Sequence, residues 1–195
     1  MNLNELKNKA YQCAIAHGWH EKEHSDNHYL CLIISELMEA VQADRKGKRA
    51  NVSMFKEYQG NNLPLSEETL IRRFKEDYEA YIKDSVEDEL ADSLIRLLDL
   101  AGLRNIDIDN LPEFDIEAYA ECCENETFTE SIYYVSTIPT MLFYEYDYQL
   151  EKQLNSMILS VFGISFHLDI DLFWHIQQKM RYNELRTYKH GNKKY

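Results

Sequence analysis

The chain has little proline and glycine, with three prolines and six glycines among its 195 residues. β-Sandwiches and barrels need turn-forming residues at short, regular intervals, so this scarcity argues against an all-β fold. The sequence also lacks any run near the ~18 consecutive apolar residues of a membrane-spanning helix. Its N-terminus lacks the apolar stretch of a signal peptide. We therefore expect an all-α protein that is neither anchored in a membrane nor exported.

Cysteine is scarce as well, and no two of the four cysteines form a CxxC pair. Cys122 and Cys123 are adjacent, and neighbouring cysteines do not easily close a relaxed disulfide. Reduced thiols are typical of the cytosol, so the expected location is cytoplasmic.

Positive charge is the third deficit, because 21 Lys and Arg face 34 Asp and Glu and leave a net charge of −13. A field of this sign repels polyanions, so we expect no nucleic-acid partner and no membrane partner. A phosphorylated ligand would need bridging cations. Clustered carboxylates repel one another and can bind such cations.

Apolar residues make up 45% of the chain, enough for one sizeable core, and we interpret residues 1–195 as a single domain. Helical spacing is strongest in two segments, one from about residue 27 to Gly47 and one from Val86 to Gly102. Their apolar positions are Leu30, Ile33, Ile34, Leu37, Met38 and Val41 in the first, and Val86, Leu90, Leu94, Leu97, Leu98 and Ala101 in the second.

The remaining segments are less regular. A first helix is expected over 2–17, ending at Gly18, and two further helices over about 131–161 and 168–187, separated by Gly163. Residues 47–84 are interpreted as an insertion with a helix in its second half. Residues 105–130 form an acidic insertion, expected to be a loop around Pro112 with at most a short helix after it.

Carboxylates border both strong apolar stripes. Glu36 and Glu39 are three residues apart in the first segment, and Glu89 and Asp92 have the same spacing in the second, so each pair points to one side of its helix. If the two stripes pack together, the four acids converge and can hold a hard cation such as Mg²⁺. Each pair alone is a weak signal, because acids at this spacing are frequent on solvated helix faces.

The motif residues are Trp19, then Ser35-Glu36-Leu37-Met38-Glu39, then Glu89-Leu90-Ala91-Asp92, and finally Lys179, Asn183 and Arg186. In this order they resemble the MazG-like all-α nucleoside triphosphate pyrophosphohydrolases, whose pattern is ExxE, then ExxD, then Lys-x3-Asn-x2-Arg. The matching blocks cover less than half of the chain. Between Glu39 and Glu89 the spacing is longer than in compact members, which the insertion at 47–84 would explain.

The resemblance implies a helical bundle of the all-α NTP pyrophosphatase type with insertions between its core helices. It implies Mg²⁺, with Mn²⁺ as an alternative, bound by Glu36, Glu39, Glu89 and Asp92. The implied reaction is water attack on the α-phosphorus of a nucleoside or deoxynucleoside triphosphate, which gives the monophosphate and pyrophosphate.

The substrate contacts implied by the same resemblance are Lys179, Asn183 and Arg186. Four- and three-residue spacings place these three on one helix face, where they can meet phosphate oxygens and a sugar or base edge. Trp19 either stacks on the base or plugs the core beside a helix end.

The sequence assigns no catalytic base. Many relatives carry a further glutamate directly before the first motif acid, and this chain has Ser35 there. Two routes stay open, a water activated by the metal alone or one of the four acids accepting the proton. Two rival functions also stay open: a non-catalytic helical module that binds nucleotides or proteins, and a phosphatase that releases orthophosphate.

Two further clusters are given structural interpretations. Four histidines crowd residues 17–28 without the spacing of a zinc site, and we expect them on the surface. An aromatic stripe is expected to pack in an interface between copies, which predicts a homo-oligomer, most simply a dimer. The stripe consists of Tyr133, Tyr134, Phe143, Tyr144, Tyr146 and Tyr148.

Overall fold

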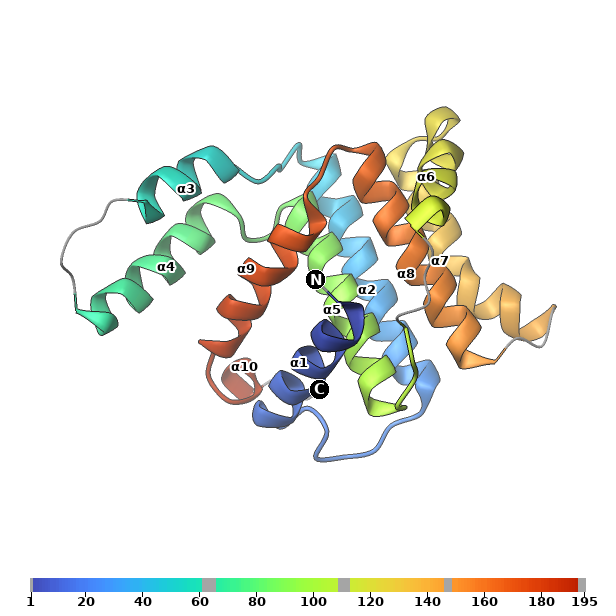
Figure 1. Cartoon of the computed structure of the whole chain (residues 1–195), viewed down its shortest axis with the longest axis horizontal. Helices are drawn as coiled ribbons and strands as arrows, with labels where there is room; N and C mark the ends of the chain where they lie inside the picture. The colour runs from blue at the N-terminus through green and yellow to red at the C-terminus, as the bar shows by residue number, and fades with distance from the viewer. Residues whose placement is uncertain (1, 61–65, 109–112, 146–148, 193–195) are drawn as a thin grey trace.

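The computed structural model describes residues 2–60, 66–108, 113–145 and 149–192 (Figure 1). In these ranges the chain forms helices and no strand, which confirms the all-α prediction. The elements are α1 (Leu3–Ala16), α2 (Asp26–Arg45), α3 (Val52–Gln59), α4 (Glu67–Tyr81), α5 (Val86–Leu103), α6 (Glu113–Cys122), the 3₁₀ turn η1 (Cys123–Asn125), α7 (Phe128–Tyr144), α8 (Leu150–His167), α9 (Leu172–Glu184) and α10 (Lys189–Asn192).

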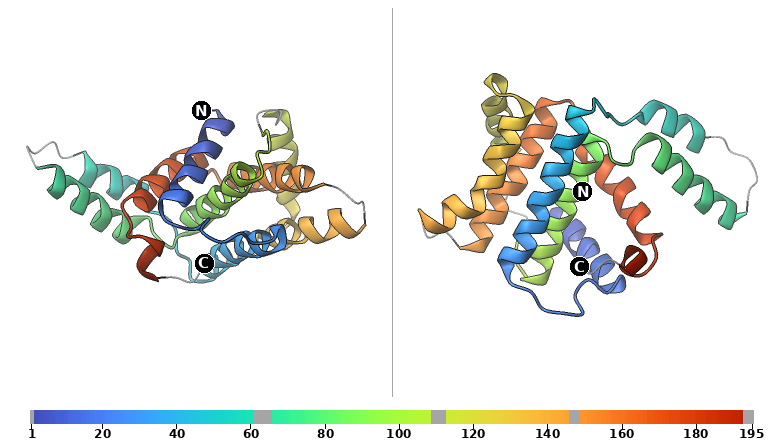
Figure 2. Two further views of the ribbon diagram at one scale, coloured as in Figure 1. Left: turned by 90° about the horizontal axis from the view of Figure 1, so that it is seen from below. Right: turned by 180° about the vertical axis from the view of Figure 1, so that it is seen from behind.

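Helix α5 lies at the centre of the bundle and packs against α1, α2, α8 and α9 (Figures 1 and 2). Its leucines at positions 90, 94, 97 and 98 are completely buried. The apolar stripe of α2 faces them, with Ile33 and Leu37 also completely buried. The two strongest helical patterns of the sequence thus pack against each other and form the main core.

Side-chain caps fix where these two helices begin. The Ser25 hydroxyl accepts a hydrogen bond from the backbone N–H of His28 at the start of α2. Ser85 does the same for Asp88 at the start of α5, over 3.2 Å. Such caps satisfy backbone donors that have no partner inside the helix, and so set the register of the acids that follow.

The predicted insertion at 47–84 is a helical hairpin of α3 and α4 that extends away from the bundle (Figure 1). It has a small apolar cluster of its own, formed by Phe55, Phe74, Tyr78, Ile82 and Tyr182. Tyr182 belongs to α9, so the hairpin rests on the C-terminal part of the bundle. The sequence indicated only the second of its two helices, because eight residues are too few to show a clear period.

Two expectations for the C-terminal half, the helix over 131–161 and the role of Gly163, are wrong. The single helix expected over 131–161 is two helices, α7 and α8. Gly163 does not separate helices but lies inside α8, where an added Cβ would be 2.5 Å from the Cβ of Tyr119 on α6. Glycine here allows two helices to approach closely, a role that the sequence pattern does not distinguish from a helix end.

The second predicted insertion, 105–130, contains α6 and η1. The loop expected around Pro112 lies outside the described residues. Among the described helices, none passes alone the length and apolarity expected of a membrane span, and α8 and α9 do so only as a pair bent by 113°.

Candidate metal and phosphate site

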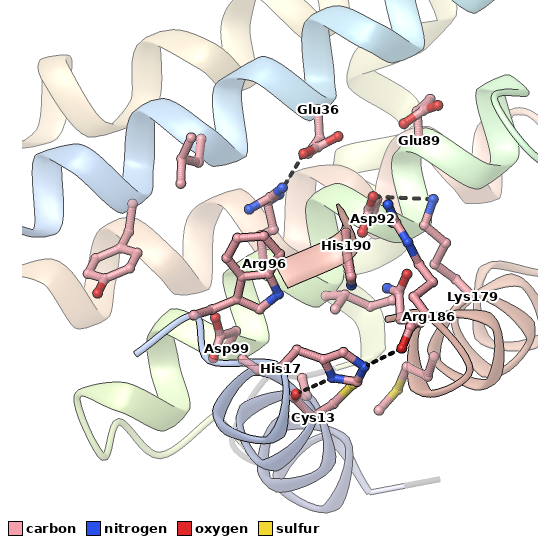
Figure 3. A pocket seen from close by; sticks show the side chains of 18 of the residues that line it. Cys13, His17, Glu36, Glu89, Asp92, Arg96, Asp99, Lys179, Arg186 and His190 are labelled. Carbon is pink, nitrogen blue, oxygen red and sulfur yellow. Dashed lines mark hydrogen bonds and ion pairs between the residues drawn. The ribbon is translucent and has the colours of Figure 1, made fainter. Parts of the chain in front are cut away.

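One cavity of about 230 Å³ opens between α1, α2, α5, α9 and the loop that follows α1 (Figure 3). Every site residue indicated by the sequence lines it. These residues are Trp19, Glu36, Glu39, Glu89, Asp92, Lys179, Asn183 and Arg186. Segments far apart in the chain therefore meet at one place.

Three of the four predicted metal ligands form a close group. Oxygen atoms of Glu36, Glu89 and Asp92, one from each, all lie within 4.8 Å of one another. Glu36 comes from α2 and is 6% exposed, and Glu89 comes from α5 and is 4% exposed. Packing of the two apolar stripes brings these acids together, because each acid borders the stripe of its own helix.

Glu39 lines the cavity but does not belong to this three-acid cluster, and its side chain is exposed. Three residues along a helix correspond to a rotation that falls about 60° short of a full turn. Glu39 is therefore turned from Glu36 toward the solvent edge of α2. Equal spacing in the sequence placed both acids near the seam but did not give them equal burial.

Burial and mutual repulsion shift the titration of the cluster. Burial raises the pKa of Glu36 to about 7, with the nearby charge of Asp92 adding to the rise and Arg96 opposing it. Burial also raises the pKa of Glu89 to about 8, although Lys179 opposes this change. Carboxylates held in this way either take up protons or share a cation, and oxygen ligands suit Mg²⁺ or Mn²⁺.

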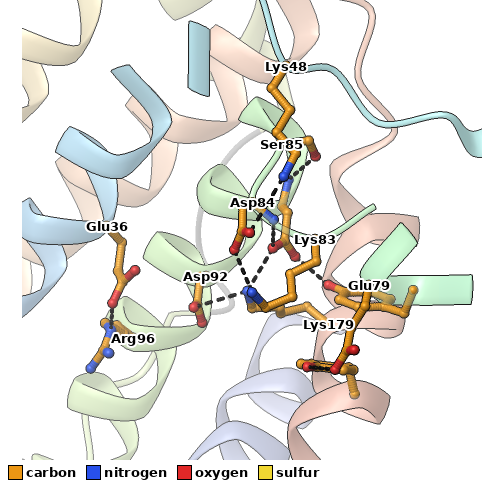
Figure 4. A network of polar contacts seen from close by, with 12 residues as sticks. Glu36, Lys48, Glu79, Lys83, Asp84, Ser85, Asp92, Arg96 and Lys179 are labelled. Atoms are coloured by element: carbon orange, nitrogen blue, oxygen red, sulfur yellow. Dashed lines mark hydrogen bonds and ion pairs between the residues drawn. The ribbon is translucent and has the colours of Figure 1, made fainter. Parts of the chain in front are cut away.

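Asp92 behaves differently from its two neighbours. Burial acts to raise its pKa, but the positive charges of Lys179 and Arg96 bring that pKa below its ordinary value. The Lys179 Nζ lies 3.2 Å from Asp92 Oδ2 (Figure 4). It also lies 3.0 Å from Asp88 Oδ2. Asp92 is therefore the acid of the cluster that is most readily ionised.

Asp88 supports the site without lining the cavity, and the sequence analysis did not identify it. Its buried carboxylate accepts hydrogen bonds from the Tyr78 hydroxyl, from the backbone N–H of Asp84 over 2.9 Å, and from Lys179. Asp88 precedes Asp92 by four residues, so both lie on one face of α5. This spacing was present in the sequence, but Asp88 falls outside the ExxD pattern.

Arg96 is the second member that the sequence analysis missed. Its Nε donates to Glu36 Oε1 over 2.6 Å, and its side chain lines the cavity (Figure 3). Arg96 follows Asp92 by four residues, which places it on the same face of α5. An arginine at that spacing was the available signal.

The substrate residues of the C-terminal motif divide between the helix and its end. Lys179 and Asn183 lie in α9, whereas Arg186 follows its last residue, Glu184. The Arg186 guanidinium is 5.9 Å from the ring centre of Tyr182. Among the described residues the buried Oδ1 of Asn183 has no hydrogen-bond partner, although the residue lines the cavity. A bound ligand that donates to this atom would satisfy it.

The other side of the cavity is aromatic. Trp19 is half-buried, and its ring meets that of His190 edge to face with centroids 5.1 Å apart. His17 contacts the carbonyl oxygens of Cys13, over 2.8 Å, and of Arg186, over 3.2 Å. These contacts join α1 to the chain that follows α9.

The expectation of surface histidines is therefore wrong for His17, which is 9% exposed, and for His20, whose side chain is 9% exposed and contacts Asp99 over 2.8 Å. His24 and His28 line the same cavity. Histidine composition alone does not indicate burial, because the ring is both apolar and polar.

Comparisons of the chain with protein-family models, with curated protein sequences and with solved structures find no match. The chemistry of the cavity and the motif spacing therefore carry the functional argument.

Proposed function

We propose that this chain is a Mg²⁺-dependent nucleoside triphosphate pyrophosphohydrolase that converts a ribo- or deoxynucleoside triphosphate to the monophosphate and pyrophosphate. The observation that carries the proposal is the convergence of three motif blocks on one cavity. That cavity combines a group of oxygen ligands, basic side chains for phosphates, an amide oxygen for a hydroxyl or N–H donor, and an aromatic wall for a base.

The three-acid cluster fits a divalent cation. Glu36, Glu89 and Asp92 offer oxygen atoms within 4.8 Å of one another. Burial raises the pKa values of the two glutamates even though basic side chains lie nearby, so a bound cation would favour their ionised forms. They would hold Mg²⁺, or Mn²⁺ as the alternative. A bound cation would neutralise charge on the phosphates and polarise the phosphorus that is attacked.

The remaining residues would orient the substrate. Lys179 and Arg186 supply positive charge in a protein whose net charge is −13, and Asn183 supplies an amide with an unsatisfied oxygen. Trp19 would lie against the base, since aromatic faces stack on any nucleobase. The cavity thereby separates a triphosphate region from a base region.

Glu39 is the acid that we assign to the attacking water. It lines the cavity but lies outside the close cluster, so it can accept a proton without giving up a shared ligand. Ser35 cannot take this role. It is exposed, its hydroxyl donates to the Leu32 carbonyl over 2.7 Å, and it does not line the cavity.

The test is turnover of a panel of ribo- and deoxynucleoside triphosphates with Mg²⁺, with pyrophosphate resolved from orthophosphate. We expect pyrophosphate, and loss of its release in Asp92→Asn. The matched control is Glu117→Gln on α6, which neutralises an exposed acid that does not line the cavity. Orthophosphate as the product would indicate a phosphatase, and Mg²⁺ binding without turnover would indicate a non-catalytic module.

A further inference from the structure

Arg96 differs from the other basic residue at the acid cluster in how much of it remains available. The Lys179 side chain is 6% exposed, and its ammonium group is shared between Asp88 and Asp92. The Arg96 side chain is 37% exposed and has one carboxylate partner, Glu36. Arg96 is therefore the more available of the two basic groups that pair with the acid cluster.

The guanidinium of Arg96 also has unused hydrogen-bond donors. Its Nε donates to Glu36 Oε1, but neither Nη atom donates to any residue within the described ranges. An arginine side chain has five N–H donors in a planar arrangement that matches phosphate oxygens. Four of these donors remain for a ligand.

The partner of Arg96 is itself a member of the three-acid cluster (Figure 3). A cation that takes Glu36 as a ligand draws electron density from this carboxylate and repels the neighbouring guanidinium. The contact between Arg96 and Glu36 would then weaken. The guanidinium would lose its anionic partner as an anionic triphosphate enters the same cavity.

We propose that Arg96 binds the triphosphate of the substrate and that Glu36 exchanges its contact with Arg96 for the metal ion when metal and substrate bind. This inference rests on the proposed function. It assigns to Arg96 a role that lies outside the three sequence motifs, and it makes the ion pair between α2 and α5 a feature of the ligand-free protein.

Arg104 provides a matched control for this role. Its Nε donates to Asp26 Oδ1 over 2.7 Å, and this ion pair also joins the end of α5 to α2. Arg104 does not line the cavity. A purely structural ion pair would make Arg96→Met and Arg104→Met alike. A phosphate-binding role would separate them.

The experiment uses two probes on wild type, Arg96→Met, Arg96→Lys and Arg104→Met. Calorimetry with an α,β-methylene nucleoside triphosphate and Mg²⁺ measures triphosphate binding without hydrolysis, and electron paramagnetic resonance measures binding of Mn²⁺ alone. We expect Arg96→Met to weaken binding of the analogue by about 10- to 100-fold, the loss typical of a charged hydrogen-bonding partner. The same variant should bind Mn²⁺ alone more tightly, because a competing positive charge has been removed from Glu36.

Arg96→Lys keeps the charge but loses the planar donor geometry, so an intermediate loss of analogue affinity is expected, and Arg104→Met should match wild type with both probes. If Arg96→Met does not fold, the comparison of Arg96→Lys with Arg104→Met still decides the test. Equal analogue affinity in wild type and Arg96→Lys, or equal losses in the Arg96 and Arg104 variants, would overturn the proposal.

The two proposals fail separately. One outcome is that wild type binds both probes, that Arg96→Met binds the analogue more weakly and Mn²⁺ more tightly, and that no pyrophosphate is released. The role of Arg96 in binding then stands and the pyrophosphohydrolase assignment falls. If wild type binds neither probe, both proposals are overturned.

Discussion

Lys179 on α9 and Asp88 on α5 are 91 positions apart in the sequence and are joined by an ion pair of 3.0 Å between Nζ and Oδ2. Neither side chain is appreciably exposed, at 6% and 0% respectively. The same ammonium lies 3.2 Å from Asp92. Lys179 therefore has a role in holding α9 against α5, besides the substrate contact proposed for it.

Replacing this lysine should destabilise the fold. Lys179→Met leaves Asp88 as a buried carboxylate without its basic partner, and removal of one member of a buried pair typically costs about 3–5 kcal/mol. Urea denaturation should show this loss, and adding Asp88→Asn in the same chain should recover part of it. An unchanged unfolding midpoint in Lys179→Met would contradict the buried pair.

Arg186 should separate binding from stability. It is half-buried, lies beyond the end of α9 and has no carboxylate partner within 4.0 Å among the described residues. We expect Arg186→Ala to weaken binding of the methylene triphosphate analogue by about 1.5–3 kcal/mol, as for a charged hydrogen bond. The free energy of unfolding should change by less than about 1 kcal/mol. An unaltered affinity would remove Arg186 from the site.

Magnesium should stabilise the protein through the three-acid cluster. The metal-free fold holds Glu36, Glu89 and Asp92 close together, so a cation that binds them raises the melting temperature by mass action. Glu89→Gln keeps the volume and removes the charge that Glu89 carries once the pH exceeds its pKa of about 8. At such a pH it should raise the melting temperature of the metal-free protein and abolish the effect of Mg²⁺.

Glu39→Gln is the comparison for this prediction, because Glu39 is exposed and outside the cluster. Its substitution should alter the stability of the metal-free protein by no more than about 0.5 kcal/mol, as is usual for surface changes. Equal stabilisation by both substitutions would show that general surface repulsion is the cause.

The raised pKa values of Glu36 and Glu89 determine in which direction the free energy of unfolding changes with pH. Unfolded glutamates release their protons near pH 4.3, whereas these two retain theirs in the folded chain until pH values of about 7 and 8. The folded state binds more protons in this window, so the free energy of unfolding of the metal-free protein should fall as pH rises from about 4.5 to 8.

Urea denaturation at several pH values checks this slope. The contribution of the two acids is the difference between wild type and the Glu36→Gln, Glu89→Gln double variant, because histidines titrate in the same range. Saturating Mg²⁺ should flatten the slope, since the metal replaces the protons. A difference that increases in favour of wild type with rising pH would contradict the assignment.

The aromatic stripe of α7 supports the proposal of a homo-oligomer, although Tyr146 and Tyr148 of the predicted stripe lie outside the described residues. Tyr133, Tyr134, Phe143 and Tyr144 are 54% to 77% exposed, and exposed apolar groups of this kind are enriched in interfaces. Light scattering should give a mass above the 23.2 kDa of one chain. Tyr134→Ser with Tyr144→Ser should shift the protein toward the monomer, and a wild type that is monomeric at micromolar concentration would refute the proposal.

The sequence predicted the helices best where the apolar periodicity is clear and the residues that mark helix ends agree with it. Segments α2 and α5 were evident because their apolar stripes continue over several turns. The division between α7 and α8 was not evident, because both helices are apolar on several faces. Gly163, which was expected to separate two helices, instead permits close packing of α8 against α6. Local patterns do not show whether a glycine ends a helix or permits a close approach.

The site was predicted as a set of positions more successfully than as a geometry. Motif spacing indicated the acids and the C-terminal residues that line the cavity. It did not reveal that Glu39 lies apart from the cluster, nor that Asp88 and Arg96 complete the charges around it. These features depend on the rotation of α2 against α5 and on which buried charges remain unpaired, and tertiary packing determines both.

The position of Lys179 also has a consequence for the order in which the molecule is made. During synthesis from the N-terminus, α2 and α5 with their acids emerge well before α9. Until residue 179 has followed, the carboxylates of Asp88 and Asp92 lack the ammonium that pairs with them in the finished fold. The growing chain should therefore keep this end of α5 hydrated, and the cavity should close only when α9 docks as a late event in folding.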